Sequence, residues 1–349
     1  MSLPIYGLSF LRNGIKYDYP FRECLLSLAG ICQDIELALG DSDDGTEKAL
    51  ADLPKLHILP TIWDENLRKG GQILSQQTNL ALENLRKRVG KGWVICLQAD
   101  EILSDQEYND LRRDLNQAEL EGCDAISFRY LHFWKSYEAI AYEWRWYAHE
   151  IRAFRIDSFI ESYGDAQSFR GWQKKYESNV HIFHYGHVRD ASAYEKKKTE
   201  FHRWWHSDAD MQKVIEKGAR RDPAEPVLRY LGPHPTVMRS RLPARISKRT
   251  TLVVFGRRED YSEEFLNRVN AELHFTLKES EIPTINSAGV VFLQCPSFWF
   301  RVKNFAFWIR EPSIPKQVKS PQAKKWTKEF YALMALGAKG VSVRGSAEC

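Results

Sequence analysis

The sequence of 349 residues has no uninterrupted apolar run long enough to cross a bilayer, and its N-terminus lacks the pattern of a secretory leader. Cysteine is scarce as well. The six cysteines, at positions 24, 32, 96, 123, 295 and 349, show neither paired spacing nor the spacing of a metal site. Several lie within apolar segments, as reduced core cysteines do. We therefore expect a cytoplasmic protein without a disulfide framework.

The chain also lacks a strong excess of charge of either sign. Its 50 basic and 46 acidic residues give a net charge of only +4. Nucleic-acid binding normally needs a concentrated basic surface, so we expect no nucleic-acid partner. The hydrophobic share of 43% and the charged share of 28% are typical of a soluble globular protein. The length favours one large domain together with a smaller one.

What the first part of the chain does have is a regular alternation of strand-like and helix-like segments. The predicted strands cover residues 5–11, 35–39, 55–59, 93–97 and 125–130. The predicted helices cover residues 21–31, 47–53, 73–89 and 107–120. Strand and helix alternating at this spacing predict an α/β fold with a parallel sheet and crossover connections.

Acidic residues follow two of these strands directly. The strand at 93–97 runs into Gln98-Ala99-Asp100-Glu101, and the strand at 35–39 runs into the acidic turn 41–46. Loops at the carboxyl ends of strands are where open α/β sheets bind nucleotides, and paired acids there commonly hold a divalent cation against phosphate. The alternative is a pair of ordinary acidic surface turns. Gly70 and Gly71, before the helix at 73–89, would let the backbone approach an anionic ligand, or simply give a flexible helix entry.

Histidine is concentrated in the middle of the chain, where seven of the ten histidines fall between residues 132 and 206. Histidine serves proton transfer and metal binding, so the cluster favours a functional site. For each single histidine a hydrogen-bonded structural role is the better explanation, so the prediction rests on the cluster.

In this order and spacing, the motifs resemble family 2 glycosyltransferases with the GT-A fold. They are most similar to a bacterial branch that carries Gln-Ala-Asp-Glu in place of the usual Asp-x-Asp. The residues that carry the resemblance are the turn 41–46, the motif 97–101, His132-Phe133, and the segments 163–170, 184–189 and 232–238. The resemblance covers roughly residues 3–242. It implies a GT-A domain at 1–242, with a mixed Rossmann-like sheet and helices on both faces. Beyond about residue 245 the resemblance fades, and strand-like and helix-like segments predict a smaller α+β extension at 243–349.

The resemblance implies transfer of a sugar, with inversion, from a nucleotide-diphosphate sugar to an acceptor in the presence of Mg²⁺ or Mn²⁺. Asp100 would bind the metal, and His184 would complete the metal ligands. Glu101 would orient these ligands without binding the metal itself. The residues expected to bind the nucleotide sugar are Asp41, Ser42, Asp44, Gly71, Gln98 and Arg170. Asp165 is the candidate general base, with Glu150 and Asp157 as alternatives. The residues expected at the acceptor or sugar are His132, Trp134 and Gln167.

Gly40 departs from the family pattern, because it stands where an acid usually contacts the nucleobase. A UDP-sugar is favoured as donor, and a glycan or lipid-linked acceptor in bacterial surface polysaccharide or lipopolysaccharide assembly is expected by analogy. The alternatives are a sugar nucleotidyltransferase and a non-catalytic nucleotide-sugar-binding protein. The aromatic and basic segment 297–310 suits either peripheral contact with the inner face of a membrane or a half-buried strand pair.

Overall fold

A computed structural model describes residues 3–67, 70–141, 146–190, 192, 227–230, 233–243 and 246, together with three strands between 251 and 292. The chain divides into two compact units. The first comprises Met1–Lys135, Trp144–Glu225 and Pro235–Val237, and the second comprises Ser136–Glu143, Pro226–His234 and Met238–Cys349. The predicted domain boundary at 242/243 stays a prediction.

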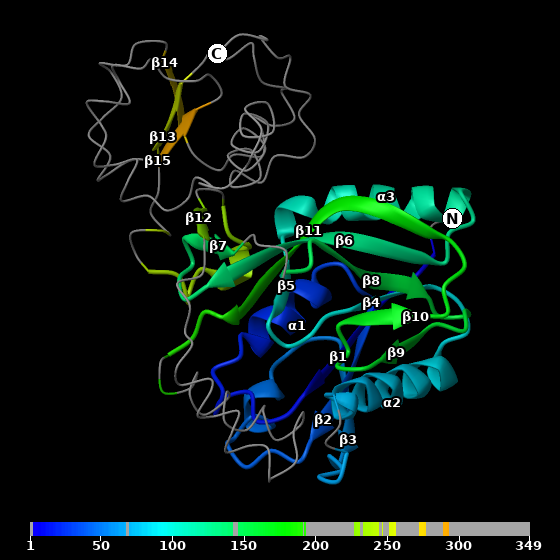
Figure 1. Ribbon diagram of the computed structural model, residues 1–349. Coiled ribbons are helices and arrows are strands. Elements are labelled where there is room, and N and C mark those ends of the chain that lie inside the picture. Colours follow the sequence, from blue (N-terminus) through cyan, green and yellow to red (C-terminus); the bar gives the residue numbers. More distant parts are fainter. Residues whose placement is uncertain are drawn as a thin grey trace. The chain divides into compact units, whose positions relative to one another are not determined.

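A parallel half of the main sheet opens the first unit (Figure 1). Strand β1 lies between β2 and β4, and β3 lies beyond β2, all of them parallel. The four strands are β1 (Ile5–Leu11), β2 (Asp34–Gly40), β3 (Leu56–Thr61) and β4 (Trp93–Cys96). Helices α1 (Phe21–Ala29) and α2 (Gln72–Arg88) form two of the crossovers. The helix predicted at 47–53 is only a 3₁₀ turn, η1 (Lys48–Leu50), since the segment is too short for a stable helix and Pro54 follows it.

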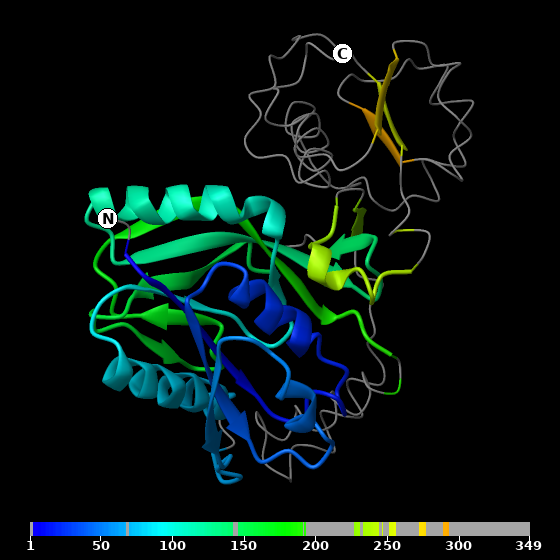
Figure 2. The same ribbon diagram turned by 180° about the vertical axis from the view of Figure 1, so that it is seen from behind.

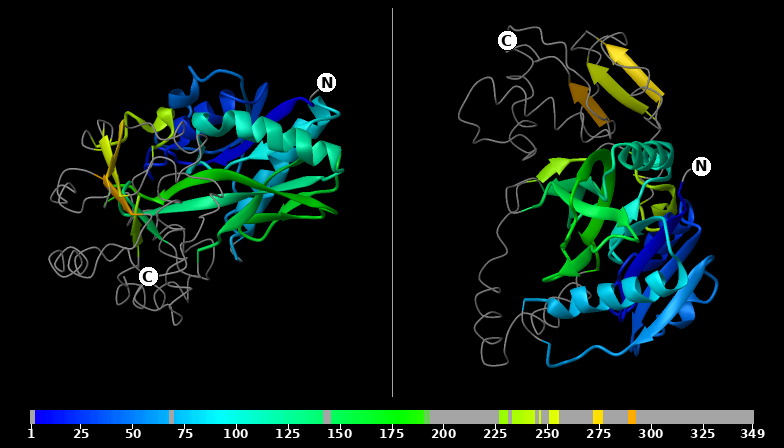
Figure 3. Two further views of the ribbon diagram at one scale, coloured as in Figure 1. Left: turned by 90° about the horizontal axis from the view of Figure 1, so that it is seen from above. Right: turned by 90° about the vertical axis from the view of Figure 1, so that its right-hand side faces the viewer.

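The second half of the sheet is mixed. Strand β8 (His149–Arg155) is antiparallel to both β4 and β6 (Ala125–Trp134), and the long β11 (Lys175–His187) is parallel to β6. Strand β5 (Glu101–Leu103) adds antiparallel to β11. The turn η2 (Asp105–Glu107) leads into α3 (Tyr108–Leu120), which packs against β6 and β11 (Figure 3). The expected α/β fold with a mixed sheet is therefore confirmed.

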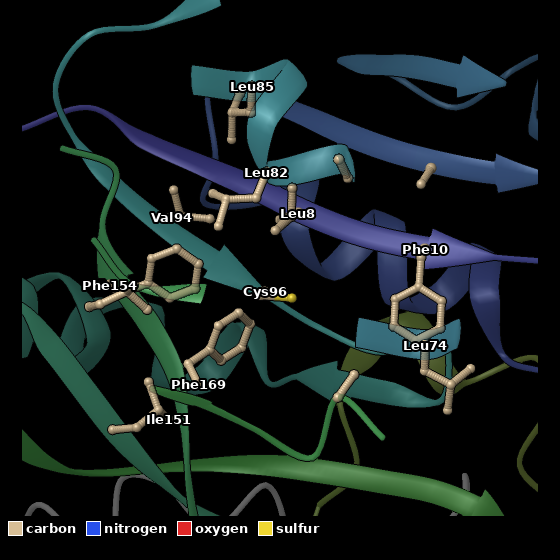
Figure 4. Packing of buried hydrophobic residues seen from close by; sticks show 14 of the residues in the cluster. Leu8, Phe10, Leu74, Leu82, Leu85, Val94, Cys96, Ile151, Phe154 and Phe169 are labelled. Carbon is tan, nitrogen blue, oxygen red and sulfur yellow. The ribbon is translucent and has the colours of Figure 1, made fainter. Parts of the chain in front are cut away.

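The core lies between the sheet and α2 (Figure 4). Residues of α2 at helical spacing, such as Leu74, Leu82 and Leu85, pack with alternate residues of the strands, such as Leu8 and Val94. Burying each such leucine stabilises the fold by roughly 1.5–3 kcal/mol. Helix α1 lies on the opposite face of the sheet from α2 (Figure 2). The hairpin of β9 (Glu161–Tyr163) and β10 (Ser168–Arg170) lies beside α2, where the Asn79 side chain hydrogen-bonds the backbone of Ser162.

In the second unit, β7 (Ala139–Ala141) pairs antiparallel with β12 (Val227–Arg229). A parallel three-stranded sheet places β13 (Thr251–Phe255) between β14 (Glu272–Thr276) and β15 (Gly289–Phe292). A further 3₁₀ turn, η3 (Thr236–Met238), has Thr236 and Val237 in the first unit and Met238 in the second. The aromatic and basic segment 297–310 lies outside the described residues. Within the described residues, no helix combines the length and apolar character needed to span a membrane.

Candidate active site

Because β1, β2 and β4 are parallel, the loops that follow them emerge at one edge of the sheet. The loop after β1 and the acidic loop after β2 are joined by side-chain to backbone hydrogen bonds. The Asn13 N–H donates to Ser42 Oγ at 3.0 Å, and the Lys16 N–H donates to Asp44 Oδ2 at 2.7 Å. Burial alone would raise the pKa of Asp44, but hydrogen bonds from Thr46 and from Lys16 outweigh it, so this pKa lies below its ordinary value. Ser42 and Asp44 therefore shape the loop itself.

Asp41, like Asp43 of the same loop, faces solvent. Its side chain is 53% exposed and lies 3.3 Å from Arg12 Nη2. Gly40, immediately before it, has no room for a side chain, because a Cβ there would lie 2.4 Å from Trp63 Nε1. The Trp63 ring thus explains why glycine stands at position 40.

The turn Gln98–Glu101 is held by the buried side chain of Glu101. Glu101 Oε2 accepts hydrogen bonds from the Gln98 N–H at 3.0 Å and from Arg152 Nε at 2.8 Å. Glu101 Oε1 accepts from Arg152 Nη2 and from the Tyr130 hydroxyl, both at 2.8 Å. Burial opposes the charge of Arg152, yet Glu101 keeps the Arg152 pKa well above its ordinary value. Both carboxylate oxygens of Glu101 therefore already accept hydrogen bonds, so this side chain is suited to supporting the turn.

Asp100 lies next to this turn, only 4% exposed, and faces a histidine and an arginine. Its Oδ1 lies 3.8 Å from His184 Nε2, and its Oδ2 lies 3.4 Å from Arg189 Nη2. The strand register explains the contact, since His184 of β11 is paired with Glu101 of β5. Gly186 makes the approach feasible, because a Cβ there would lie 2.4 Å from His184 Nε2 and 2.9 Å from Asp100 Oδ2.

His132 continues the same row of residues across the sheet, paired with His184 in the register of β6 and β11. Its Nδ1 lies 2.9 Å from His184 Nδ1, and its Nε2 lies 2.8 Å from the Tyr147 carbonyl oxygen. Burial, with the neighbouring His184 ring as a smaller cause, lowers the pKa of His132 from 6.5 to about 3. The neutral ring is 2% exposed and uses both nitrogens, so it faces His184 rather than solvent.

The turn 163–167 reaches the Gln98–Glu101 turn from the other side. Gln98 Nε2 donates to the Ala166 carbonyl at 2.9 Å, and Arg152 Nη1 donates to the Gln167 carbonyl at 2.6 Å. Asp165 caps this turn, since its Oδ1 accepts from the Gln167 N–H at 3.2 Å. The side-chain amide nitrogen of Gln167, Nε2, donates to Glu150 Oε1 at 2.6 Å. Asp165, Glu150 and Gln167 are thus brought together, and the Ala166 carbonyl of the same turn is hydrogen-bonded to Gln98.

Other predicted residues are held differently. Arg170 pairs with Glu161 at 2.6 Å across the hairpin, so its charge is already matched. Asp157 pairs with Arg155, whose register partner Trp93 begins β4, so Asp157 lies at the opposite edge of the sheet from Asp100. Gly71 precedes α2 with a φ of 69°, a conformation that glycine adopts readily. Trp134 is half-buried among aromatic rings, with Trp146 at 5.5 Å and His187 at 4.8 Å.

Sequence reasoning missed Arg152 and Tyr130. The available signal was Arg152 itself, a charged residue inside the otherwise apolar run 151–154. A charge in a buried strand is expected only where a partner neutralises it.

No protein-family model matches the sequence, and no curated protein matches it. Among solved structures, the chain is similar to TarS of S. aureus, with 13% identity, 63% of this chain and 43% of that chain covered, and a TM-score of 0.34. The chain thus spans less than half of that protein. Residues 1–349 of TarS, solved in complex with UDP, match with 12% identity, 63% and 71% coverage and a TM-score of 0.34. A Desulfovibrio desulfuricans G20 protein described as a nucleotide-diphospho-sugar transferase matches with 18% identity, 46% and 66% coverage and a TM-score of 0.29.

Proposed function

We propose that this protein is a glycosyltransferase that moves a sugar from a nucleoside-diphosphate sugar, favoured as a UDP-sugar, to a glycan or lipid-linked acceptor with inversion. The observation that carries the proposal is the contact between Asp100, in the turn after β4, and His184 of β11. Arg189 links this pair to the loop after β1, because its guanidinium contacts both Asp100 and the Tyr17 carbonyl. The ordered motifs 41–46, 97–101 and 184–189 support it by their resemblance to family 2 glycosyltransferases. A role in surface polysaccharide or lipopolysaccharide assembly is part of the same proposal.

The residues around Asp100 fit a divalent cation. Within the described part of the chain, no group of three or more histidine, cysteine or acidic residues gathers around one point. Asp100 and His184 would hold Mg²⁺ or Mn²⁺ as two protein ligands, which leaves coordination positions for substrate phosphates and water. The cation supplies Lewis-acid charge to a departing diphosphate. Glu101 and Arg152 keep the Asp100 turn in place, and Arg189 adds positive charge beside it.

On the acceptor side, Asp165 is the proposed general base. The turn that carries it is fixed to Gln98 through the Ala166 carbonyl. A carboxylate on a turn that is hydrogen-bonded to the Gln98–Glu101 turn could take the proton of an attacking hydroxyl while the diphosphate leaves on the far side of the sugar. That arrangement gives inversion in a single displacement. Glu150, joined to the same turn through Gln167, is the alternative base.

The alternative function is a sugar nucleotidyltransferase, which releases pyrophosphate from a nucleoside triphosphate and a sugar phosphate. Such enzymes usually carry a glycine-rich, arginine-containing loop after the first strand. Here the loop after β1 contains one glycine, Gly14, between residues 12 and 19. A glycosyltransferase instead releases a nucleoside diphosphate, so identification of the released product separates the two functions. A non-catalytic protein would bind the nucleotide and release neither.

The metal assignment predicts the behaviour of Asp100→Asn in a thermal-shift panel. UDP, GDP, dTDP and CMP are tested with and without Mn²⁺, because a ligand of the native state at 100 times its Kd adds about 2.7 kcal/mol of apparent stability. For the wild-type protein we expect UDP to raise the Tm, and Mn²⁺ to enlarge the shift. Asp100→Asn should lose the Mn²⁺-dependent part.

The matched control is Asp157→Asn, an acid at the opposite edge of the sheet, which should keep the full shift. A wild-type protein that no nucleotide stabilises would count against the proposed function. If Asp100→Asn keeps the Mn²⁺-dependent part of the Tm shift, Asp100 is not a metal ligand.

The base assignment predicts that Asp165→Asn lowers kcat by about 10²–10⁴-fold with little change in the affinity for the nucleotide. The amide can still cap the turn 163–167, so folding should be retained. Steady-state kinetics of nucleotide release measure the effect, with Glu150→Gln as the paired variant. If Glu150→Gln shows the large loss and Asp165→Asn does not, the two roles are exchanged.

A further inference from the structure

The hydrogen bonds of His132 fix where the protons of two neighbouring histidines lie. The Tyr147 carbonyl oxygen accepts only, so the contact at 2.8 Å requires a proton on His132 Nε2. The ring is 2% exposed, which disfavours a second proton and a charge. Nδ1 of His132 is therefore an acceptor.

The next contact follows from this. His184 Nδ1 lies 2.9 Å from His132 Nδ1, and only a proton on His184 Nδ1 makes that contact a hydrogen bond. A neutral His184 with its proton on Nδ1 presents a lone pair at Nε2. This atom lies 3.8 Å from Asp100 Oδ1, which is too far for a hydrogen bond, so in the neutral ring a nitrogen lone pair and a carboxylate face one another.

We propose that His132 is a positioning residue that locks His184 in the tautomer protonated on Nδ1, so that His184 Nε2 and Asp100 together present electron pairs to one divalent cation. The inference rests on the metal-dependent function proposed above. It gives His132 a task different from acceptor binding, the role expected from sequence.

The packing of His132 supports this task, because the ring has no freedom to turn. Tyr130 stacks on it with centroids 5.2 Å apart, and the Tyr147 ring meets its edge at 4.5 Å. Partners behind a metal-binding histidine commonly set its tautomer and orientation, and their loss typically costs 10–100-fold in metal affinity.

The first measurement is the tautomer itself, observed by ¹⁵N NMR of histidine-labelled, metal-free protein. The His184 signals are identified as those missing from His184→Gln. We expect a protonated Nδ1 and an unprotonated Nε2 in the wild-type protein, and loss of this pattern in His132→Phe. A wild-type His184 protonated on Nε2 overturns the proposal, even if every variant fails to fold.

The second measurement is Mn²⁺ binding without substrate, followed by EPR of free Mn²⁺. We expect His132→Phe to bind about 10–100-fold more weakly than the wild-type protein. His132→Asn keeps an acceptor oxygen and a donor nitrogen in the side chain and should recover part of the loss. His149→Phe, which changes a histidine of β8 outside this contact chain, should bind normally. Equal Mn²⁺ affinity in wild-type protein and a folded His132→Phe overturns the proposal.

The two measurements separate this inference from the proposed function. A wild-type protein that shows the expected tautomer but binds no Mn²⁺, with or without UDP, refutes the metal-dependent transferase and the ligand role of Nε2 together. Normal Mn²⁺-dependent activity with an unchanged tautomer in His132→Phe refutes only the role of His132.

Discussion

Gly186→Ala is expected to abolish metal-dependent activity while leaving the protein folded. The φ of Gly186 lies outside the left-handed region, so an alanine backbone fits there without strain. The added Cβ, however, would lie 2.4 Å from His184 Nε2 and 2.9 Å from Asp100 Oδ2. His184 cannot yield easily, because its other nitrogen is held by His132. Losing several kcal/mol of Lewis-acid stabilisation should lower kcat on the order of 10³-fold or more.

The control for this variant is Gly90→Ala, where an added Cβ meets nothing within 4 Å. It should match the wild-type protein in Mn²⁺ affinity and in kcat. The second control is the pair His184→Ala and His184→Ala/Gly186→Ala. His184→Ala removes the imidazole that the new methyl group would meet. The effects of the two substitutions on kcat should therefore be strongly non-additive. A Gly186→Ala enzyme with normal Mn²⁺ affinity would show that the Asp100–His184 contact does not carry the site.

The parallel half of the sheet could be predicted from sequence because each strand is followed by its own crossover within a short stretch of chain. Local periodicity therefore shows strand, helix and direction together. The mixed half could not be predicted in this way. Strand β8 enters between β4 and β6, and only pairing across long stretches of sequence places it there. Such pairings leave no local pattern.

The site shows the same division. Asp100 and the loop after β2 could be proposed as site candidates from the sequence because they directly follow predicted strands. The row Glu101–His184–His132 is set by strand register between residues up to 83 positions apart, since β5 pairs with β11 and β11 with β6. For that reason the sequence could not predict the contact between His132 and His184, whose Nδ1 atoms lie 2.9 Å apart. The role of His132 at the acceptor stays a prediction. Gly40 can be read from the sequence, but its contact with the Trp63 ring, which leaves no room for a side chain there, cannot.

Arg152→Met is expected to be the most destabilising substitution in the site. The ion pair between Arg152 and Glu101 is buried, with 1% and 0% side-chain exposure, and has N–O distances of 2.8 Å. Removing the guanidinium leaves a buried carboxylate without its charge partner, which typically costs 3–5 kcal/mol. The Gln167 carbonyl would lose its donor as well. Urea unfolding measures the loss in the free energy of unfolding.

The matched control is Arg170→Met, which breaks an exposed arginine–glutamate pair with a contact of 2.6 Å and exposures of 64% and 49%. Water replaces such a partner, so the expected loss is at most about 1 kcal/mol. Adding Glu101→Gln to Arg152→Met removes the stranded charge and should recover part of the stability, because the amide can still accept from the Tyr130 hydroxyl. Equal losses in the two arginine variants would mean that the buried pair is not what holds the Gln98–Glu101 turn. A large loss confined to Arg152→Met and relieved by Glu101→Gln would show that the stability of the fold depends on Arg152 neutralising the buried Glu101.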